Sequence, residues 1–381
     1  MSQAPHSHGM SGDSVPPVWP LLRQEELCEL LRGFPQVGSL QAVQWHSPRP
    51  FSAAALVTTT GGQWFVKRHH RRVRTAAELQ EEHGFIAHLD RQGCPVPQVE
   101  RDGDGHSAIE RDGWTYEVHA RAKGADLYRD TQSWEPFQRP AHAQAAGLAL
   151  ARLHEAAQGY LAPGRQAQAL VSRPSCLNSV NLLDAVEAQA ERSPALGRYL
   201  AGRDWRCELA LLVPLQRVAR EHLRRQPPLW THNDWHASNL LWNRQGDLDG
   251  VASVLDFGLC DRTCAIYDLA TALERNAIAW LELDHGRAAR ADLATVDHLL
   301  AGYAQARPLT GPQVDALVAV LPMVHLDFAL SEVAYFEGLL EDRANADLAW
   351  EGYLLRHARW FEAEDGQRLL GHLRERRGDW A

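Results

Sequence analysis

The residues best suited to chemistry lie in the segment "WTHNDWHASNLLW", residues 230–242. Within it, His232, Asp234 and Asn239 form the pattern H-x-D-x-x-x-x-N, and Asp256 follows in "LDFGL". Phosphoryl transfer needs one carboxylate that orients a hydroxyl or accepts its proton. It also needs an asparagine and a second aspartate that hold Mg²⁺ against nucleotide phosphates. The residue types and their order therefore predict a phosphoryl-transfer site.

Two alternatives remain open for this segment. A zinc site is conceivable because His232 and His236 are four residues apart, but it needs a helix and a third ligand. Structural coincidence is the other, since neither H-x-D-x-x-x-x-N nor D-F-G is specific by itself. Here both occur in order, with a β-hairpin predicted between them from "LLWN" and "VASVL". The combination favours the kinase-like site.

The elements that must position these residues change in type along the chain. A short helix is predicted at residues 24–33, and the runs "QAVQWHS", "AAALVTTT", "QWFVKRH" and "SAIERDGWTYEVHA" predict five strands, with one helix in "TAAELQEEHGFIAHLDRQG". After Gly124 the pattern becomes helical, with the hairpin as the only β-element. We therefore predict an α+β, bilobal, protein-kinase-like fold. It has a small antiparallel β-sheet N-lobe plus one helix at 21–119, a larger, mainly helical C-lobe at 120–381, and a flexible leader at 1–20.

A kinase-like site also requires a lysine on the third strand and a glutamate on the next helix. Lys67 is the only lysine of the predicted N-lobe. On the helix, Glu82 falls on the apolar face, where it can pair with Lys67, and Glu78 is the alternative; the apolar face contains Leu79, Ile86 and Leu89. Both charges could instead lie on the surface, but a glutamate within an apolar stripe is costly to bury unpaired.

The segment between the first two strands, "HSPRPFSAAALV", contains no glycine. It therefore lacks the G-x-G-x-x-G loop that covers the phosphates in eukaryotic protein kinases. The nucleotide phosphates would be held by backbone N–H groups or by Ser52.

"THNDWHASNLLW" and "VLDFGL" resemble the aminoglycoside phosphotransferase and choline kinase-like superfamily, whose motif is H-G-D-x-H-x-x-N. "LQEEHGFIAHLDRQGCPVPQV", "AAGLALARLHEA" and "IYDLATAL" resemble further segments of it, so the resemblance covers about residues 40–360. Asn233 replaces the motif glycine. Because asparagine tolerates left-handed backbone geometry, we expect the loop to keep its shape.

The resemblance implies a role for each matching residue. Asp234 would be the catalytic base, and Asn239 and Asp256 would bind Mg²⁺. Lys67 would contact the α- and β-phosphates of ATP, and Glu82 would position Lys67.

It also implies supporting residues. His232 would brace the catalytic loop, and Asp268 would fix the loop's backbone. The adenine would lie at the connection that includes Glu117, Val118 and His119, and would contact backbone groups.

The acceptor would bind between the catalytic loop and the C-terminal helices. A stripe of small and polar residues that includes Asp327 and Ser331 would form a substrate surface or, alternatively, a close helix–helix contact. Trp235, next to the base, would wall the acceptor site with His236, or pack in the core.

Composition sets the outer limits. A net charge of −9 excludes a general nucleic-acid footprint and mildly favours a cationic acceptor. Six scattered cysteines indicate a reducing compartment, and the cytoplasm is expected. We expect no membrane segment, because no apolar run approaches the length of a span, and either a monomer or a homodimer.

The expected function is ATP-dependent phosphorylation of a hydroxyl on a small molecule, such as an amino-alcohol, a sugar, a homoserine-like metabolite or an aminoglycoside. A protein Ser/Thr kinase and a nucleotide-binding pseudokinase are the alternatives. The short interval between Asp256 and Asp268 has no sign of an activation segment, which disfavours the protein kinase. Retention of every expected catalytic group disfavours the pseudokinase.

Overall fold

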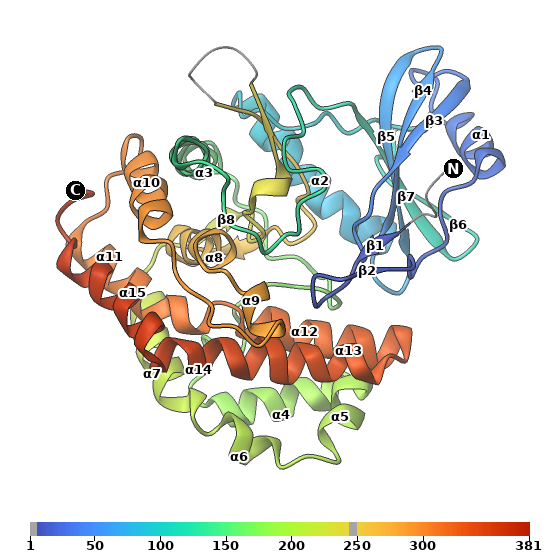
Figure 1. Ribbon diagram of the computed structural model, residues 1–381. Helices are drawn as coiled ribbons and strands as arrows, with labels where there is room; N and C mark the ends of the chain where they lie inside the picture. Colours follow the sequence, from blue (N-terminus) through green and yellow to red (C-terminus); the bar gives the residue numbers. More distant parts are fainter. Residues whose placement is uncertain (1–5, 244–249) are drawn as a thin grey trace.

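The computed structural model describes residues 6–243 and 250–381, which form two lobes (Figure 1). The smaller lobe contains a five-stranded antiparallel sheet with the strand order β3-β4-β5-β7-β6. Its elements are α1 (Gln24–Leu31), β3 (Leu40–His46), β4 (Ala53–Thr59), β5 (Gly62–His70), α2 (Ala76–Arg91), β6 (Ile109–Arg111) and β7 (Trp114–Ala120). The five predicted strands and the two predicted helices of this lobe are confirmed.

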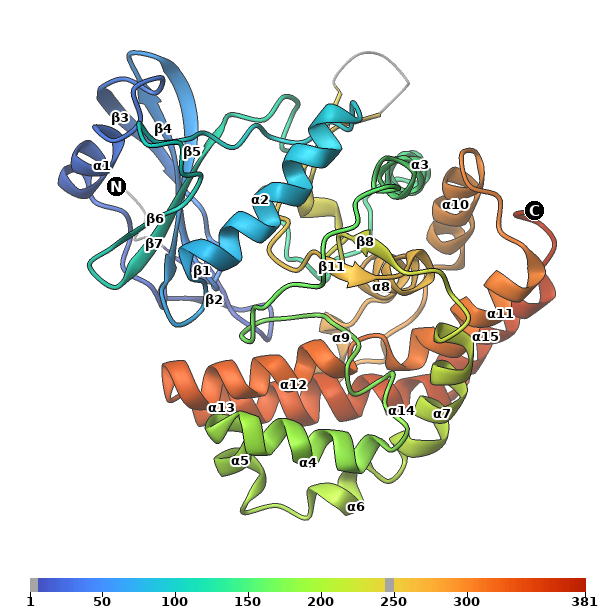
Figure 2. The ribbon, with the colours of Figure 1, turned by 180° about the vertical axis from the view of Figure 1, so that it is seen from behind.

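The two faces of this sheet differ because side chains alternate along each strand. One face packs against α1 and is apolar, with Val57, Val66 and Val118 fully buried. The opposite face lies toward α2 and the larger lobe (Figure 2). Lys67 on β5 and Glu117 on β7 are directly paired and lie on this second face. The sheet therefore presents its charged face to the space between the lobes.

The predicted flexible leader is wrong for residues 6–20. Strands β1 (Ser7–His8) and β2 (Ser14–Val15) pair as a hairpin, and the Ser7 hydroxyl donates to the Pro48 carbonyl at 2.7 Å. Farther along, the Trp19 ring stacks on His70, and its indole N–H donates to the Tyr335 hydroxyl at 3.1 Å. These partners lie far away in the sequence, so a composition rich in Pro, Ser and Gly gave no sign of them. Residues 1–5 lie outside the described residues.

The larger lobe is mainly helical, as predicted. Its helices are α3 (Pro140–Ala156), α4 (Leu182–Arg192), α5 (Pro194–Leu200), α6 (Trp205–Leu209), α7 (Leu212–Leu223), α8 (Ala265–Ala277), α9 (Leu281–Asp284), α10 (Leu293–Ala304), α11 (Gly311–Val320), α12 (Leu326–Tyr335), α13 (Arg343–Asp347), α14 (Arg356–Glu362) and α15 (Glu364–Glu375). Shorter 3₁₀ and π segments are η1 (Ala237–Asn239), η2 (Leu321–Met323), η3 (Phe336–Leu340) and η4 (Leu348–Leu355).

Two small antiparallel pairs carry the catalytic segments of this lobe. The predicted hairpin is present as β9 (Leu240–Trp242) with β10 (Val251–Val254). A second pair, β8 (Leu229–Thr231) with β11 (Asp261–Thr263), was not predicted, because three-residue strands leave little periodic signal. Together the pairs bring the segment after β8 next to the segment after β10.

The helical stretch Gly311–Leu340 is long and apolar enough to cross a membrane, contrary to the expectation that no run approaches that length. However, 89% of its apolar window is buried inside the protein. The core helix of a globular lobe meets the same criteria, and its apolar side chains are covered here by the surrounding helices.

Helices α3 and α10 lie side by side and approach each other through two glycines (Figure 1). A Cβ atom on Gly147 would collide with the backbone carbonyl of Leu299, and one on Gly302 with the carbonyl of Gln144. Backbone cannot move aside as a flexible side chain can, so these two positions fix the spacing of the helices.

We expect Gly147→Ala and Gly302→Ala each to lower the free energy of unfolding by about 2–3 kcal/mol, because overpacking forces the helices apart. Gly371→Ala, in α15 with open space around it, is the control and should raise it by about 0.5–1 kcal/mol. Urea unfolding measures all three. Equal midpoints for Gly147→Ala and the parent chain would disprove the close approach.

Candidate active site

The catalytic loop, between β8 and η1, is held by the buried carboxylate of Asp268 on α8. Its Oδ2 accepts from the His232 backbone N–H at 2.8 Å, and its Oδ1 from that of Asn233 at 2.8 Å. The His154 Nε2 lies 3.0 Å from the same carboxylate, and the Tyr303 hydroxyl lies 2.8 Å from His154 Nδ1. Helices α3, α8 and α10 therefore all contribute to the position of the loop.

Asn233 adopts a left-handed backbone with φ of 61°, as its residue type led us to expect. Its side chain adds contacts that a glycine lacks. The Oδ1 accepts from the hydroxyls of Thr231 at 2.8 Å and Thr263 at 3.1 Å, and the Nδ2 donates to the Leu259 carbonyl at 3.2 Å. Asparagine thus supplies the required geometry and also ties β8 to the segment around β11.

Asp234 lies at the floor of the space between the lobes. The Asn239 Nδ2 donates to its Oδ2 at 3.2 Å, His236 Nε2 lies 3.4 Å from the same oxygen, and Arg275 Nη2 lies 3.8 Å from Oδ1. Burial raises the pKa of Asp234, but His236, Arg275 and His232 outweigh it and hold the pKa below its ordinary value. The carboxylate is therefore ionised and can orient a hydroxyl and receive its proton.

His232 uses both ring nitrogens inside the loop. Its Nδ1 accepts from the Asp234 backbone N–H at 3.2 Å, and its Nε2 donates to the Leu255 carbonyl at 2.8 Å. His236 Nδ1 lies 2.9 Å from the Ser238 hydroxyl, and its other ring nitrogen faces Asp234. Because His232 has no ring nitrogen left for a ligand, the zinc alternative for His232 and His236 is wrong.

Lys67 lies where the kinase-like pattern requires it, but its ion-pair partner is Asp256, with Nζ 3.0 Å from Oδ1. Burial lowers the pKa of Lys67, but Asp256, Glu117 and Glu82 outweigh it and raise the pKa. Asp256 has a left-handed φ of 52° and lies two residues after β10 ends at Val254. Strain of this kind is common where a side chain must be aimed at a ligand.

The expected Lys67–Glu82 ion pair is not present. Glu82 is buried and faces Arg165, whose Nη2 lies 3.2 Å from its Oε2. Arg165 also donates to the Gly258 carbonyl at 2.9 Å, so α2 is joined to the loop that carries Asp256. Glu78, the alternative, caps α2 by accepting from the Thr75 backbone N–H at 2.8 Å. The sequence could not place Arg165, because it lies in an irregular segment after α3.

A cavity of about 940 Å³ between the lobes is large enough for a nucleotide. Its lining includes Ser52, Lys67, Glu82, Glu117, His119, Asn239 and Asp256. Of the residues predicted to contact the adenine, Glu117 and His119 line this cavity, whereas the Val118 side chain is buried in the sheet and its carbonyl accepts from the Glu100 N–H at 2.7 Å.

A second cavity, of about 140 Å³, is lined by Asp234 and adjoins the first, with which it shares Lys67, Asn239 and Asp256. Trp134 and Phe328 contribute its aromatic wall, and its polar lining includes His236 and the charged side chains of Arg49, Lys67, Arg74, Asp234, Asp256, Arg275 and Glu332. Arg49, on the loop between β3 and β4, lines both cavities, and its guanidinium donates to the Ser133 hydroxyl at 3.1 Å. Apart from His236 and the residues of the kinase-like pattern, no local sequence pattern identifies these lining residues. Their place in the cavity depends on how the helices are rotated and on the course of the loops in the folded protein.

Three predicted acceptor residues have structural roles instead. Trp235 is fully buried in the core. Asp327 accepts from the backbone N–H groups of Cys176 at 2.7 Å and Leu177 at 3.1 Å, and Ser331 accepts from that of Val171 at 2.9 Å. Asp327 and Ser331 thereby anchor the segment before α4 to α12. The cavity faces the neighbouring stripe of α12, which bears Phe328 and Glu332.

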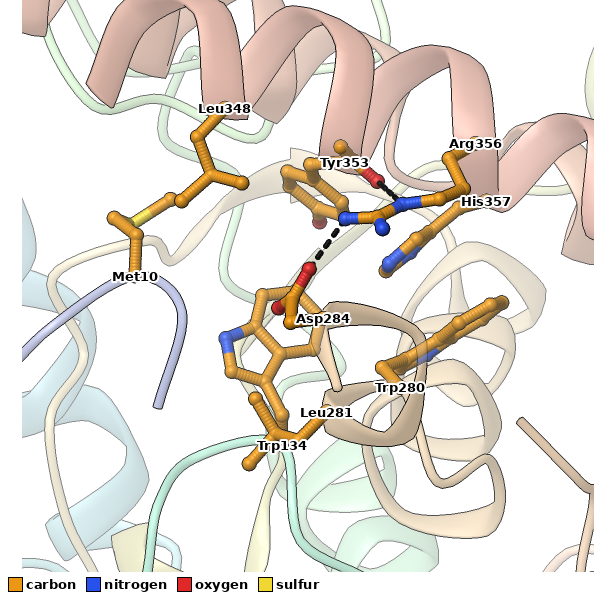
Figure 3. Close-up of a pocket in the computed structure, with 10 residues that line it drawn as sticks. Met10, Trp134, Trp280, Leu281, Asp284, Leu348, Tyr353, Arg356 and His357 are labelled. Atoms are coloured by element: carbon orange, nitrogen blue, oxygen red, sulfur yellow. Dashed lines mark hydrogen bonds and ion pairs between the residues drawn. The ribbon is translucent and has the colours of Figure 1, made fainter. Parts of the chain in front are cut away.

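A third cavity adjoins the second through Trp134 (Figure 3). Its volume is only about 30 Å³, because Trp280 and His357 stack with ring centroids 3.6 Å apart and Arg356 donates to the Leu283 carbonyl at 3.2 Å across its rim. This space suits one water molecule, so it offers no ligand site.

Comparison with known proteins agrees with this geometry. The family model described as "Phosphotransferase enzyme family" matches residues 50–309. A homoserine kinase of Chelativorans sp. (strain BNC1) is 27% identical over 323 residues, covering 83% of this chain and 87% of that protein. A homoserine kinase of Gluconacetobacter diazotrophicus is 29% identical over 285 residues, covering 74% and 77%.

Solved structures share the fold at lower identity. A microcompartment-associated aminopropanol kinase superposes with a TM-score of 0.58 and 19% identity, covering 90% of this chain and 98% of that one. An aminoglycoside phosphotransferase from Alicyclobacillus acidocaldarius gives 0.54 and 17%, covering 95% and 98%. The predicted protein-kinase-like fold is confirmed. Because the family match spans more than half of its length, the chain belongs to the phosphotransferase enzyme family and is a small-molecule kinase that acts on a hydroxyl group.

Proposed function

We propose that the acceptor of this kinase is a small amino-alcohol of the homoserine type, and that the donor is ATP held with Mg²⁺. The observation that carries the proposal is an acidic side chain without a partner in the second cavity. Glu332 is buried there, and within the described residues its Oε2 has no hydrogen-bond partner. A buried carboxylate without a partner is costly, and an ammonium group on the acceptor would remove that cost.

The charges around Glu332 support a cationic acceptor. Asp234, Glu274 and Glu332 all lie around one guanidinium, that of Arg275, which stacks on Trp134 at 3.9 Å. Around Arg275 the three acidic side chains outnumber the one guanidinium, whereas the rest of the cavity lining also holds Arg49, Lys67 and Arg74. Burial raises the pKa of Glu274 and of Glu332, and an ammonium group beside Glu332 would favour its ionised form.

Cavity size supports a small acceptor. Sites for drug-sized ligands usually measure about 300–1,000 Å³, whereas this cavity measures about 140 Å³. An aminoglycoside is therefore disfavoured. Two of the relatives named above are homoserine kinases. Homoserine carries an ammonium group that suits Glu332 and a carboxylate that suits Arg275.

The donor groups fit Mg²⁺. Burial raises the pKa of Asp256, but Lys67 outweighs it and keeps the carboxylate ionised. Asn239 donates its Nδ2 to the Asp234 carbonyl at 3.0 Å, which turns its Oδ1 away from Asp234. A carboxylate and an amide oxygen are ligands that Mg²⁺ prefers. When bound, the metal would neutralise charge on the transferred phosphoryl group.

The remaining steps belong to this chain's own residues. Lys67, on the sheet, would contact the nucleotide phosphates, and Asp234 would orient the acceptor hydroxyl and receive its proton as the phosphoryl group moves. Arg49 and Ser52 take the place of a glycine-rich loop, since both lie at the boundary of the two cavities. A guanidinium there can hold phosphate oxygens in a bidentate manner.

Asp234→Ala is expected to lower kcat by about 10²–10⁴-fold, the range that a positioned general base contributes. Nucleotide binding should stay within about threefold, because Asp234 does not line the donor cavity. ADP release with homoserine and a fluorescent-nucleotide titration measure the two effects. Full activity in Asp234→Ala would disprove its assignment as base.

Glu332→Gln should raise KM for amino-alcohols by about 10-fold or more, since a charge-assisted contact contributes about 1.5–3 kcal/mol. KM for ATP should not change. Glu337→Gln, one turn farther along and paired with Arg343 outside the cavity, is the matched control. A panel of homoserine, aminopropanol, ethanolamine, serine, a neutral diol and kanamycin identifies the acceptor. Turnover of only the diol would contradict the proposal.

The activity should also depend on pH. Burial raises the pKa of Glu332 to about 8, with Asp234 and Glu274 adding to the rise and Arg275 opposing it. Below that pH the side chain is protonated and cannot attract an ammonium group, so kcat/KM for a cationic acceptor should rise as pH increases from 6 to 8. The rise should vanish in Glu332→Gln. An identical profile in the variant would assign the titration to another group.

A further inference from the structure

A second cluster of titratable side chains lies in the N-lobe, away from the catalytic loop. Three histidine rings converge on the buried carboxylate of Glu117. His69 Nε2 lies 2.9 Å from Oε1, and the Nε2 atoms of His83 and His119 each lie 2.8 Å from Oε2. We call these four residues the histidine–glutamate cluster.

The sheet register and α2 build this cluster. His119 is two residues after Glu117 on β7, so both side chains lie on the same face of the sheet. His69 is two residues after Lys67 on β5, and Lys67 pairs directly with Glu117, so all four lie together. His83 reaches the same point from α2 and is buried. Three separate elements therefore direct ligand atoms to one place.

The ligand atoms are close enough together to share one metal ion. The ligand atoms of His83, Glu117 and His119 all lie within 4.8 Å of one another. Two imidazole nitrogens and one carboxylate form the donor set of many zinc and iron sites, which leave further positions for water. Glu117 and His119 line the cavity between the lobes, which gives an ion and a water a route to the site.

Neighbouring side chains hold these three residues in the way that outer hydrogen bonds orient the ligands of known metal sites. His83 Nδ1 lies 2.9 Å from the Ser107 hydroxyl, which leaves Nε2 directed at the cluster. His69 contacts the Glu117 oxygen that the other two histidines do not use. Outer contacts of this kind fix the tautomer and the rotation of ligands.

A hydrogen-bonded network without metal is the alternative. Burial alone would raise the pKa of Glu117, but His119, His69 and His83 hold it well below the ordinary value. A carboxylate offers about four acceptor sites, so three histidine N–H groups fit Glu117 without a metal. What favours a metal is that the Nε2 atoms of His83 and His119 converge on a single oxygen of Glu117, where one cation can replace the two shared protons.

We propose that His83, Glu117 and His119 bind a divalent transition metal of the zinc class, with water from the inter-lobe cavity completing the coordination. Binding replaces the shared N–H···O contacts, with each imidazole proton residing on Nδ1. The site is distinct from the proposed Mg²⁺ site at Asn239 and Asp256. Because Glu117 faces Lys67, the bound ion would change the charge next to the nucleotide.

Titration of the full-length protein with Co²⁺ tests this proposal, since Co²⁺ substitutes for zinc and absorbs visible light strongly only at low coordination number. We expect one equivalent to bind with intense d–d bands. His83→Gln should abolish these bands, as should His119→Gln, the more exposed position if the first variant fails to fold. Ser107→Ala should weaken binding by about 10-fold.

Controls separate this site from others. His88→Gln, on the same helix but with its ring nitrogen 2.9 Å from the Ala156 carbonyl, should keep the bands. Asp256→Asn removes the active-site ligand and should also keep them. Loss in His106→Gln would instead assign the metal to the exposed group Asp102, Asp104 and His106. That loss, retention of the bands in His119→Gln, or no bands at one equivalent would each overturn the proposal.

Discussion

The hydrogen bonds from the catalytic loop to Asp268 are the contact on which the rest of the site depends. One carboxylate receives the backbone N–H groups of His232 and Asn233, so it fixes the backbone directly before Asp234. Asp268 is completely buried, and such a carboxylate is stable only when its partners are in place. Its third partner, His154, is held in turn by Tyr303.

This chain of contacts links packing to chemistry. His154 lies on α3 and Tyr303 on α10, and these helices touch through Gly147 and Gly302. A change in helix spacing would therefore move the partners of Asp268 and, through it, the catalytic loop. Placement to within a fraction of an ångström is what phosphoryl transfer requires, because catalysis rests on positioning and electrostatics.

Ion pairs between the lobes set the second constraint. Lys67 of the sheet meets Asp256 of the larger lobe, and Glu82 of α2 meets Arg165. All four groups are wholly or partly shielded from water, so separating the lobes would leave charges without their partners. The proposed nucleotide and Mg²⁺ would replace the first of these pairs, because each brings the opposite charge to Lys67 or Asp256.

The sequence by itself determined the five strands of the N-lobe sheet, the two N-lobe helices, the hairpin after the loop, and the positions of Asp234, Asn239, Asp256 and Lys67. These elements and residues follow from local periodicity and from motif spacing, both of which can be read without knowledge of the fold. Only the tertiary structure decided that Glu82 meets Arg165 and that Glu332, rather than Ser331, faces the cavity. One residue along a helix is a rotation of about 100°, so packing of neighbouring elements settles which face is used. The histidine–glutamate cluster was equally hidden, because its members come from three elements that only the folded sheet and helix bring together.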